Sequence, residues 1–249
     1  MTYLAKLKII SLLSLGIFLT GCASMNSQEN PDPFESMNRA VFDFNEMVDD
    51  NVIEPVARNY KRFVPQPIQL VVGNAFSNAN DVVVTANSIL QLNFESAAAS
   101  ATRFVINTTF GLFGAIDIAS DISAASDINL NKRNEDFGQT MGHYGVATGP
   151  YLVIPLMGPS TIRDAVGMGV DSLVAHPVTT IVYLNSVDVL DAAVRTPVAV
   201  GMSLDARAKL LDVDKTMEEA ALDKYEFVRD AYLQRRDSLV KNEDIELKD

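Results

Sequence analysis

Long stretches of this 249-residue chain carry almost no charge, and this limits the folds open to it more than any other feature. Residues 64–128 hold six charged side chains: Asp81, Glu95, Arg103, Asp117, Asp121 and Asp127. Asp171 is the single charge between Ala165 and Val187. Globular domains are normally about a quarter charged throughout. A body this poor in charge must hide its apolar surface in a large core, against partners or against lipid.

The apolar segments are also interrupted. After the first 21 residues, no segment offers about 18 uninterrupted apolar residues, so a simple transmembrane helix is not expected. Helices broken by Gly and Pro can lie in a bilayer only if the broken backbone is buried in protein or lines a wet cavity. By contrast, about half of the residues from Asp205 to Asp249 are charged. The sequence therefore predicts a charge-poor body and a charged C-terminal tail.

The N-terminus has the pattern of a secretory signal. Lys6 and Lys8 precede a short apolar run over residues 9–19, which is too short to span a bilayer. Leu19-Thr20-Gly21-Cys22 then resembles a bacterial lipobox, in which small residues precede the cysteine that accepts lipid. We expect residues 1–21 to be removed and Cys22 to carry diacylglyceryl and an amide-linked chain such as palmitate. The alternative is an ordinary signal peptide with an incidental Cys22, or an N-terminal membrane anchor.

Lipid on Cys22 would anchor the protein to a membrane, and more than one chain is needed for stable anchoring. Ala23 and Ser24 follow the cysteine in place of the aspartate typical of inner-membrane retention, which favours the outer membrane of a Gram-negative bacterium, on its periplasmic side. Residues 22–31 form a polar tether. The chain has no second cysteine, so an intramolecular disulfide is impossible.

The charge balance argues against one class of partner. The net charge of the chain is −12, and loss of the two lysines of the signal peptide makes it −14. An acidic chain of this kind is a poor candidate for binding nucleic acid. It is also unsuited to hold anionic lipid through a basic patch.

Periodicity predicts a mostly α-helical body. Asp32 is expected to cap a helix whose apolar face, including Phe34, Met37, Val41 and Phe44, packs inward. Further helices are expected over residues 68–76, over 94–110 with a break at Gly111 and Gly114, after Pro159 with Thr161 as N-cap, over 178–200, and from Asp214 onward. Strand signals are weak.

The segment from Phe137 to Ser160 differs from the rest. It contains Gly138, Gly142, Gly145, Gly149 and Gly158 together with three prolines, so a regular helix is not expected there. Its side chains between Gly149 and Gly158 are nonetheless nearly all apolar. An apolar, glycine-rich loop is unusual for a connection exposed to water.

Catalytic motifs are missing from the sequence. Its two histidines, His143 and His176, form no H-E-x-x-H pattern, and there is no G-x-S-x-G or phosphate-binding loop. A triad of Ser160, His143 and Asp164 can be drawn, but no spacing demands it. We expect neither an enzyme, nor a metal site, nor a cofactor.

Several motifs occur in an order that resembles the MlaA (VacJ) lipoproteins. They are Asp32-Pro33-Phe34-Glu35-Ser36-Met37-Asn38-Arg39 with Phe42-Asp43-Phe44-Asn45, Arg103–Thr108 with Gly111, Gly114 and Asp117, Asp136–Thr140, Gly149–Pro155 and Gly158–Asp164. The resemblance covers about residues 22–235. One departure is Leu92, which follows Gln91 where the family pattern has glycine.

The resemblance implies both a fold and a role. Proteins of this family are helical rings that lie in the inner leaflet of the outer membrane and enclose an amphipathic channel. Misplaced phospholipid passes from the outer leaflet through the channel to a periplasmic carrier of an ABC transport system. The family also associates with trimeric porins. By this resemblance, residues 32–235 form the helical domain and 236–249 the charged tail.

Two sets of candidate residues follow. The glycine-rich segment is expected to line or gate the lipid path, through Gly142, Tyr144, Gly145, Thr148, Gly149, Tyr151, Val153 and Ile154. The alternative is a packed connector whose glycines form turns. The first helix is expected to support the channel structurally, through Phe34, Asn38, Arg39, Phe42, Phe44 and Asn45. The alternative is an ordinary amphipathic helix on a globular core.

Two other functional classes remain open from the sequence. A scaffold lipoprotein would bind a porin or the envelope without moving lipid, and would purify without lipid. A lipid-modifying enzyme would change the lipid and need a nucleophile. Mass spectrometry of lipid that purifies with the mature protein separates these classes.

The lipobox yields the first prediction. Replacement Cys22→Ser is expected to leave an uncleaved, unlipidated and mislocalised protein, because the hydroxyl cannot take the place of the thiol in lipid transfer. Globomycin, which blocks the lipoprotein signal peptidase, is expected to make the precursor of the unmodified chain accumulate. Normal processing and outer-membrane fractionation of the serine variant would contradict the assignment.

Overall fold

The computed structural model describes residues 32–174, 204–211 and 222–243. The mostly α-helical prediction is confirmed, with one short β-hairpin added. The elements are α2 (Glu35–Val48), the π-helix η2 (Asp49–Ile53), α3 (Glu54–Phe63), α4 (Gln66–Leu90), α5 (Phe94–Thr109), α6 (Ile118–Ala125), α7 (Phe137–His143), β1 (Tyr151–Ile154), β2 (Gly158–Thr161), α8 (Ile162–Val174) and α11 (Lys224–Val240). The signal peptide, the lipidated tether and the helix expected over 178–200 lie outside the described residues.

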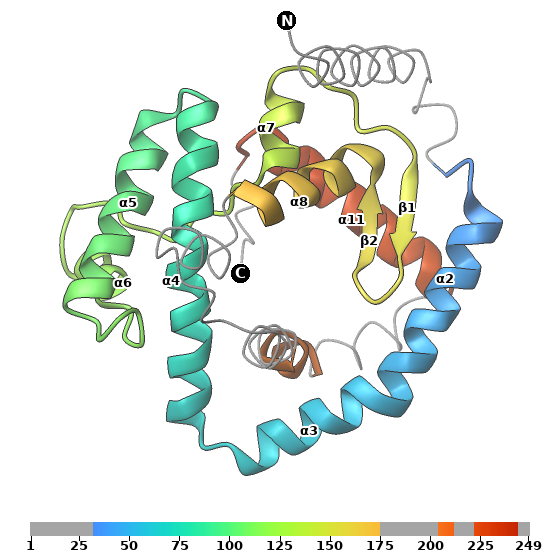
Figure 1. The fold of residues 1–249 in the computed structure, drawn as a ribbon, viewed down its shortest axis with the longest axis horizontal. Helices are drawn as coiled ribbons and strands as arrows, with labels where there is room; N and C mark the ends of the chain where they lie inside the picture. The colour runs from blue at the N-terminus through green and yellow to red at the C-terminus, as the bar shows by residue number, and fades with distance from the viewer. Residues whose placement is uncertain (1–31, 175–203, 212–221, 244–249) are drawn as a thin grey trace, which may run out of the picture.

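The helices are arranged in a ring, as the resemblance implied (Figure 1). Helices α2 and α3 join through η2 into one curved arc, and α4 continues the ring on the next side. The hairpin, α7, α8 and α11 close the side opposite α3, while α5 and α6 lie outside α4. A short helical stretch, residues 204–211, packs beside α3, where Ala57, Ala208 and Leu211 form a small core.

The α4–α5 pair is built from small side chains. Ala97, Ala99 and Ser100 of α5 are buried, and Val84 and Ser88 are buried on α4. Small residues let two helix backbones approach closely without large hydrophobic side chains between them. The ring therefore holds together through several small clusters instead of one large core.

Arg103 is the largest fully buried side chain and lies at the centre of a polar network. Its guanidinium donates to both carboxylate oxygens of Asp117, at 3.0 and 2.9 Å, and to the carbonyl oxygen of Leu130 at 2.5 Å. It also forms an ion pair of 3.5 Å with buried Asp81, which accepts a 2.6 Å hydrogen bond from Lys132. Three of the six charges of residues 64–128 thus meet at one point.

Asp117 also stabilises the turn between α5 and α6. It is the N-cap of α6 and accepts hydrogen bonds from Ser120 and Asn107. Burial raises the pKa of Asp117, but the hydrogen bonds from Ser120, Asn107 and Arg103 outweigh burial and lower it to about 2. The carboxylate is therefore negatively charged at neutral pH and forms an ion pair with the positive charge of Arg103.

Two local expectations at the α2 end were wrong. Asp32 does not cap the helix, because α2 begins at Glu35 after Phe34, and the buried Asp32 carboxylate instead accepts hydrogen bonds from Asn38 and Tyr225. The apolar face was expected to pack inward, yet Phe34, Met37 and Phe44 are 42%, 50% and 43% exposed. Val41 is the exception, because it is partly buried with Phe42 against Tyr151 and Tyr225. The inward side is the adjoining one, which carries Asn38 and Asn45, the groups that bind the hairpin.

The glycine-rich segment is more regular than expected. Its first part forms the short helix α7, whose N-cap Asp136 accepts a 2.8 Å hydrogen bond from the Gln139 amide. Its last part forms the antiparallel hairpin, with Tyr151 opposite Thr161 and Ile154 opposite Gly158. The expected cap of α8 is confirmed, since Asp164 N donates to Thr161 Oγ1 at 3.2 Å.

Leu92 lies where the resemblance led us to expect glycine. It lies in the turn between α4 and α5 with a φ of 59°. Glycine adopts this left-handed conformation without the steric cost that a Cβ brings. The chain tolerates a leucine here, with its side chain exposed.

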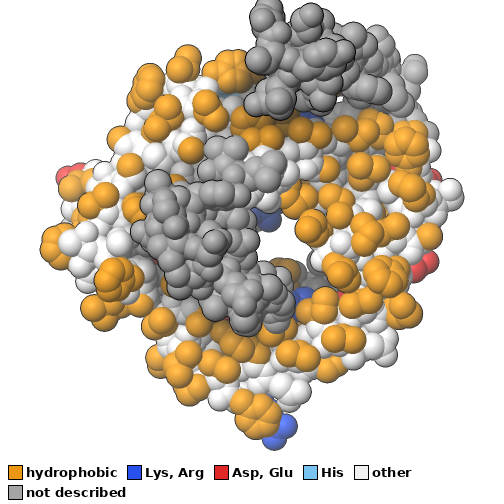
Figure 2. Space-filling view, in the orientation of Figure 1, with side chains coloured by type: hydrophobic (Ala, Val, Ile, Leu, Met, Phe, Trp, Pro, Cys, Tyr) orange, Lys and Arg blue, Asp and Glu red, His pale blue; other side chains and the backbone are white. Residues whose placement is uncertain are grey.

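Large apolar side chains cover much of the outer surface (Figure 2). The most exposed of them include Phe63, Phe110, Leu112 and Phe113, the last at 85%. Within the described residues, no helix is both long and apolar enough to cross a membrane. Apolar surface on this scale indicates contact with lipid or with a partner.

The Arg103 network predicts a large stability loss on substitution. Arg103→Leu should lower the free energy of unfolding by about 3–5 kcal/mol, because it leaves the buried Asp81 and the half-buried Asp117 without this counter-charge. Denaturant unfolding of the detergent-solubilised protein measures this change. The control is Arg58→Leu, which removes a 54%-exposed arginine paired with Glu54 on one helix face and should cost less than about 1 kcal/mol. Equal losses in the two variants would mean that the network contributes no special stability.

Candidate functional site

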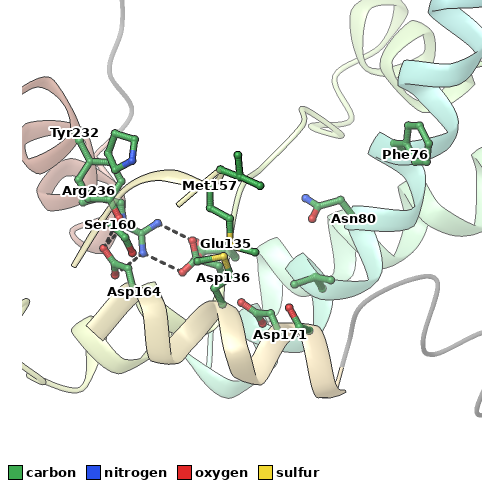
Figure 3. A pocket seen from close by; sticks show the side chains of 15 residues that line it. Phe76, Asn80, Glu135, Asp136, Met157, Ser160, Asp164, Asp171, Tyr232 and Arg236 are labelled. Atoms are coloured by element: carbon green, nitrogen blue, oxygen red, sulfur yellow. Dashed lines mark hydrogen bonds and ion pairs between the residues drawn. The ribbon is translucent and has the colours of Figure 1, made fainter. Parts of the chain in front are cut away.

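A cavity of about 680 Å³ lies inside the ring, between α4, the hairpin, α8, α11 and the residues before α7 (Figure 3). In the space-filling view of Figure 2, the molecule is hollowed near the middle of the ring. The apolar part of the lining comes from α4, α8 and the hairpin tip, and consists of Phe76, Val83, Leu156, Met157, Pro159 and Met168. The volume lies within the range of about 300–1,000 Å³ that is usual for ligand sites.

The polar part of the lining is organised by Arg236 of α11. Its guanidinium donates to both oxygens of Asp136, at 2.6 and 3.0 Å, and to both oxygens of Asp164, at 3.0 and 2.8 Å. Tyr232 donates a further hydrogen bond of 2.8 Å to Asp164. Burial raises the pKa values of Asp136 and Asp164, but Arg236 lowers them by more, so both stay ionised. The cluster joins α11 to the start of α7 and to α8.

Two more carboxylates face the cavity without such a partner. Asp171 accepts hydrogen bonds from the Asn87 side chain at 3.1 Å and from the Phe137 amide at 2.8 Å. Glu135 accepts one of 2.7 Å from Gln91. Burial raises the pKa of both groups. Within the described part of the chain, neither takes part in an ion pair, which leaves this wall of the cavity acidic.

Helix α2 fixes the hairpin through two asparagines. Asn38 is fully buried, donates to the Tyr151 carbonyl at 3.0 Å and accepts from the Val153 amide at 2.9 Å. Asn45, two helical turns further on, donates to the Ile154 carbonyl at 3.0 Å and accepts from the Leu156 amide at 2.8 Å. The two side chains hydrogen-bond along the free edge of β1 as a neighbouring strand would.

Aromatic packing completes this support. Tyr151 and Val153 are buried with Tyr225 of α11, and Phe42 of α2 packs edge-on against Tyr225 at a centroid distance of 5.5 Å. Arg39 lies over the same ring at 4.4 Å and pairs with Asp223 at 2.9 Å. The hairpin, α2 and α11 therefore form one packed unit.

The tip of the hairpin projects into the cavity lining. Leu156 and Met157 are exposed, and both line the cavity. Leu156 has a φ of 63° and Gly158 a φ of 85°, so the turn uses left-handed backbone at two positions. Glycine adopts this conformation without steric cost, whereas leucine does so rarely.

The residues expected to form the lipid path lie mostly away from this cavity. Tyr151 and Val153 are core residues, and Ile154 lies beside them on β1. Gly142, Tyr144, Gly145, Thr148 and Gly149 lie at and after the end of α7, where Tyr144 donates to the Leu90 carbonyl and Thr148 accepts from Arg163. The cavity lining instead includes the distal part of the same segment, residues 156–160.

The imagined catalytic triad is not assembled by the described contacts. Asp164 is engaged by Arg236 and Tyr232. The exposed ring of His143 packs edge-on against Tyr144, with centroids 5.1 Å apart. Ser160 is buried and donates to the carbonyl of Thr161.

The acidic cavity residues were missed as site residues although the sequence carried a signal for one of them. Asp171 is the single charge in a 23-residue apolar stretch, and a lone charge in such a stretch indicates a functional or paired group. Asp164, Met168 and Asp171 recur at helical spacing, which places them on one face of α8. Arg236 and Glu135 had no comparable signal, because charges surround them in the sequence.

The fold and the site define a class of protein: a helical ring with an apolar outer surface around an amphipathic cavity. The model of the MlaA lipoprotein family matches residues 30–239, and the chain belongs to this family. The chain is 34% identical over 236 residues to the intermembrane phospholipid transport system lipoprotein MlaA of Escherichia coli K12, covering 92% of this chain and 87% of that protein. The chain is 35% identical to the protein of the same name from Shigella flexneri, again over 92% of this chain and 87% of that protein.

A solved structure, reported as "Structural basis for maintenance of bacterial outer membrane lipid asymmetry", agrees with these relatives. The similarity has a TM-score of 0.70 at 32% identity, and it covers 84% of this chain and 98% of that one. The helical ring is therefore shared with a protein of known structure.

The Asn38 contacts predict a local effect. Asn38→Leu keeps the volume but leaves the Tyr151 carbonyl and the Val153 amide buried without partners, at a cost of about 2–5 kcal/mol. Amide hydrogen exchange of Val153 should accelerate strongly, while exchange in the distant α5 should change little. The control is Asn51→Leu, which removes a hydrogen bond of an exposed side chain to its own helix. Unchanged protection of Val153 would show that Asn38 does not hold the hairpin.

Proposed function

We propose that this protein is an outer-membrane lipoprotein that removes misplaced phospholipid from the outer leaflet. In this proposal, lipid enters the cavity of the ring and leaves toward the periplasm, where a carrier of an ABC transport system receives it. The result is maintenance of outer-membrane lipid asymmetry. The observation that carries the proposal is an open amphipathic cavity within a ring whose outer surface is itself apolar.

Each half of that observation has a physical role. An apolar outer surface allows the ring to lie in the hydrocarbon of a leaflet, and lipid on Cys22 would hold it there. A phospholipid needs apolar contacts for its chains and polar contacts for its head group. Phe76 and Met168 offer the first, and the carboxylates with Arg236 offer the second. The names of the relatives support the same role, as does the similar structure, whose subject is outer-membrane lipid asymmetry.

Partners follow from the same proposal. The exposed apolar belt around Phe110 and Phe113 is suited to contact the bilayer or a trimeric porin, since both present apolar surfaces. The chain carries no energy-coupling motif, so any transport here is passive or driven by partners. A scaffold role without lipid movement would not explain why the ring contains an amphipathic cavity.

The glycine-rich segment is proposed to gate this path through its hairpin tip. Leu156 and Met157 lie on the cavity, and the tip is attached to α2 by the hydrogen bonds of Asn45. A turn with left-handed backbone, bordered by Gly158, is suited to move between two positions. Movement of the tip away from the cavity would widen the path.

A disulfide provides the test. In Asn45→Cys/Leu156→Cys, oxidation should hold the tip against α2, because the Leu156 backbone amide already donates to the Asn45 side chain. The mature chain offers no thiol besides the acylated Cys22. Phospholipid in the outer leaflet, measured by an amine-reactive label that does not cross the membrane, should rise several-fold on oxidation and fall on reduction.

Both single-cysteine variants serve as controls under the same oxidant, and neither should respond. Equal clearance of phospholipid by the oxidised and reduced double variants would show that the tip is not a gate. The interpretation of the segment as a packed connector would then hold.

A further inference from the structure

The polar wall of the cavity carries an excess of negative charge. Among the residues that the structure describes, its lining holds four carboxylates, from Glu135, Asp136, Asp164 and Asp171, and one cation, Arg236. Arg236 already bridges Asp136 and Asp164 with four hydrogen bonds. Its charge also lowers the pKa of Glu135 and Asp171, but burial outweighs it and raises both.

Asp171 is placed to receive a ligand. It lies on the face of α8 that lines the cavity, where Asp164, Met168 and Asp171 follow one another at spacings of four and three residues. Each Asp171 oxygen accepts one hydrogen bond, from Asn87 or from Phe137, which leaves each with capacity for another. Figure 3 shows Asp171 on the same side of the cavity as Glu135 and Asp136.

A charged carboxylate in such a place is costly without a counter-ion. Burial raises the pKa of Asp171, because it makes the charged form of the carboxyl group less favourable. A cation that enters the cavity would remove the cost, whereas an anion would add repulsion. The lining thus discriminates between ligands by charge.

We propose that the cavity selects phospholipids whose head group carries an ammonium, and that Asp171, aided by Glu135, is the residue that determines this preference. The inference rests on the proposed function and specifies the lipid class. The ammonium of a zwitterionic head group such as ethanolamine donates to Asp171, while the acyl chains lie toward Phe76 and Met168. A head group without a cation, such as glycerol, gains no such contact and leaves its phosphate near uncompensated carboxylates.

The test uses the full mature lipoprotein in detergent. It is incubated with vesicles of phosphatidylethanolamine and phosphatidylglycerol in equal amounts and with identical chains, is re-purified, and its retained lipid is measured by mass spectrometry. The unmodified protein should retain about fivefold more phosphatidylethanolamine, as expected for one partly screened ion pair.

Two variants remove the preference by different routes. Asp171→Asn deletes the charge, and Met168→Lys places a cation one turn from Asp171 while the hydrogen bonds of Asp171 stay intact. Both should bring the ratio to about one, so a folding defect in the first leaves the second decisive. Asp121→Asn on α6 changes the net charge of the chain by the same amount as Asp171→Asn but outside the cavity, and it should keep the preference.

The outcomes separate the two proposals. Retained lipid in the ratio supplied, with no change between variants, overturns the selectivity and leaves the lipid path standing. A preference that persists in Met168→Lys also overturns it. Absence of retained lipid in the unmodified protein contradicts the lipid path itself, and the selectivity falls with it.

Discussion

The ring depends on one guanidinium at its closing point. Arg236 of the last described helix binds Asp136 at the start of α7 and Asp164 on α8 with four hydrogen bonds, in a site that is mostly buried. Charge-assisted, two-pronged pairs of this kind fix geometry as well as supply energy. Because α11 also packs on α2 through Tyr225, the same helix links the first and last parts of the ring. Arg236, Asp136 and Asp164 all line the cavity, so this closure is also part of its wall.

A low charge content has opposite consequences on the two sides of the ring. Outside, apolar side chains such as Phe113 remain exposed, which water alone would not favour. Buried charges gather around Arg103, between α4, α5 and α6, and around the cavity inside the ring. Buried charges are tolerated when they are paired, and Arg103 forms ion pairs with both Asp81 and Asp117. Asp171 forms none with the described residues, which is why we assign binding to the cavity and not to the Arg103 network.

The sequence predicted helices well where periodicity was strong and capping was local. The α5 helix begins where its periodicity indicated and α8 where its cap Thr161 indicated, and the structure adds Asn93 as the cap of α5. Prediction from the sequence failed where contacts between distant parts of the chain decide which way a side chain points. Asp32 had the spacing of a cap, but Asn38 and Tyr225 bind it in the folded chain. The face of α2 that carries Asn38 and Asn45 turned inward because the edge of β1 needed hydrogen-bond partners, and no periodicity of apolar residues reports that need. Arg236 likewise gave no signal, because its partners lie about 70 and 100 residues away in the sequence.

The central claim is that phospholipid occupies the cavity inside the ring, and site-specific photocrosslinking in cells tests it most directly. A photoreactive amino acid is placed either at Met168 in the cavity or at Phe113 on the outer surface, and the irradiated protein is analysed by mass spectrometry. Phospholipid adducts are predicted at both positions. Adducts at Phe113 without any at Met168 would mean that lipid surrounds the ring but does not enter it, and would contradict the claim.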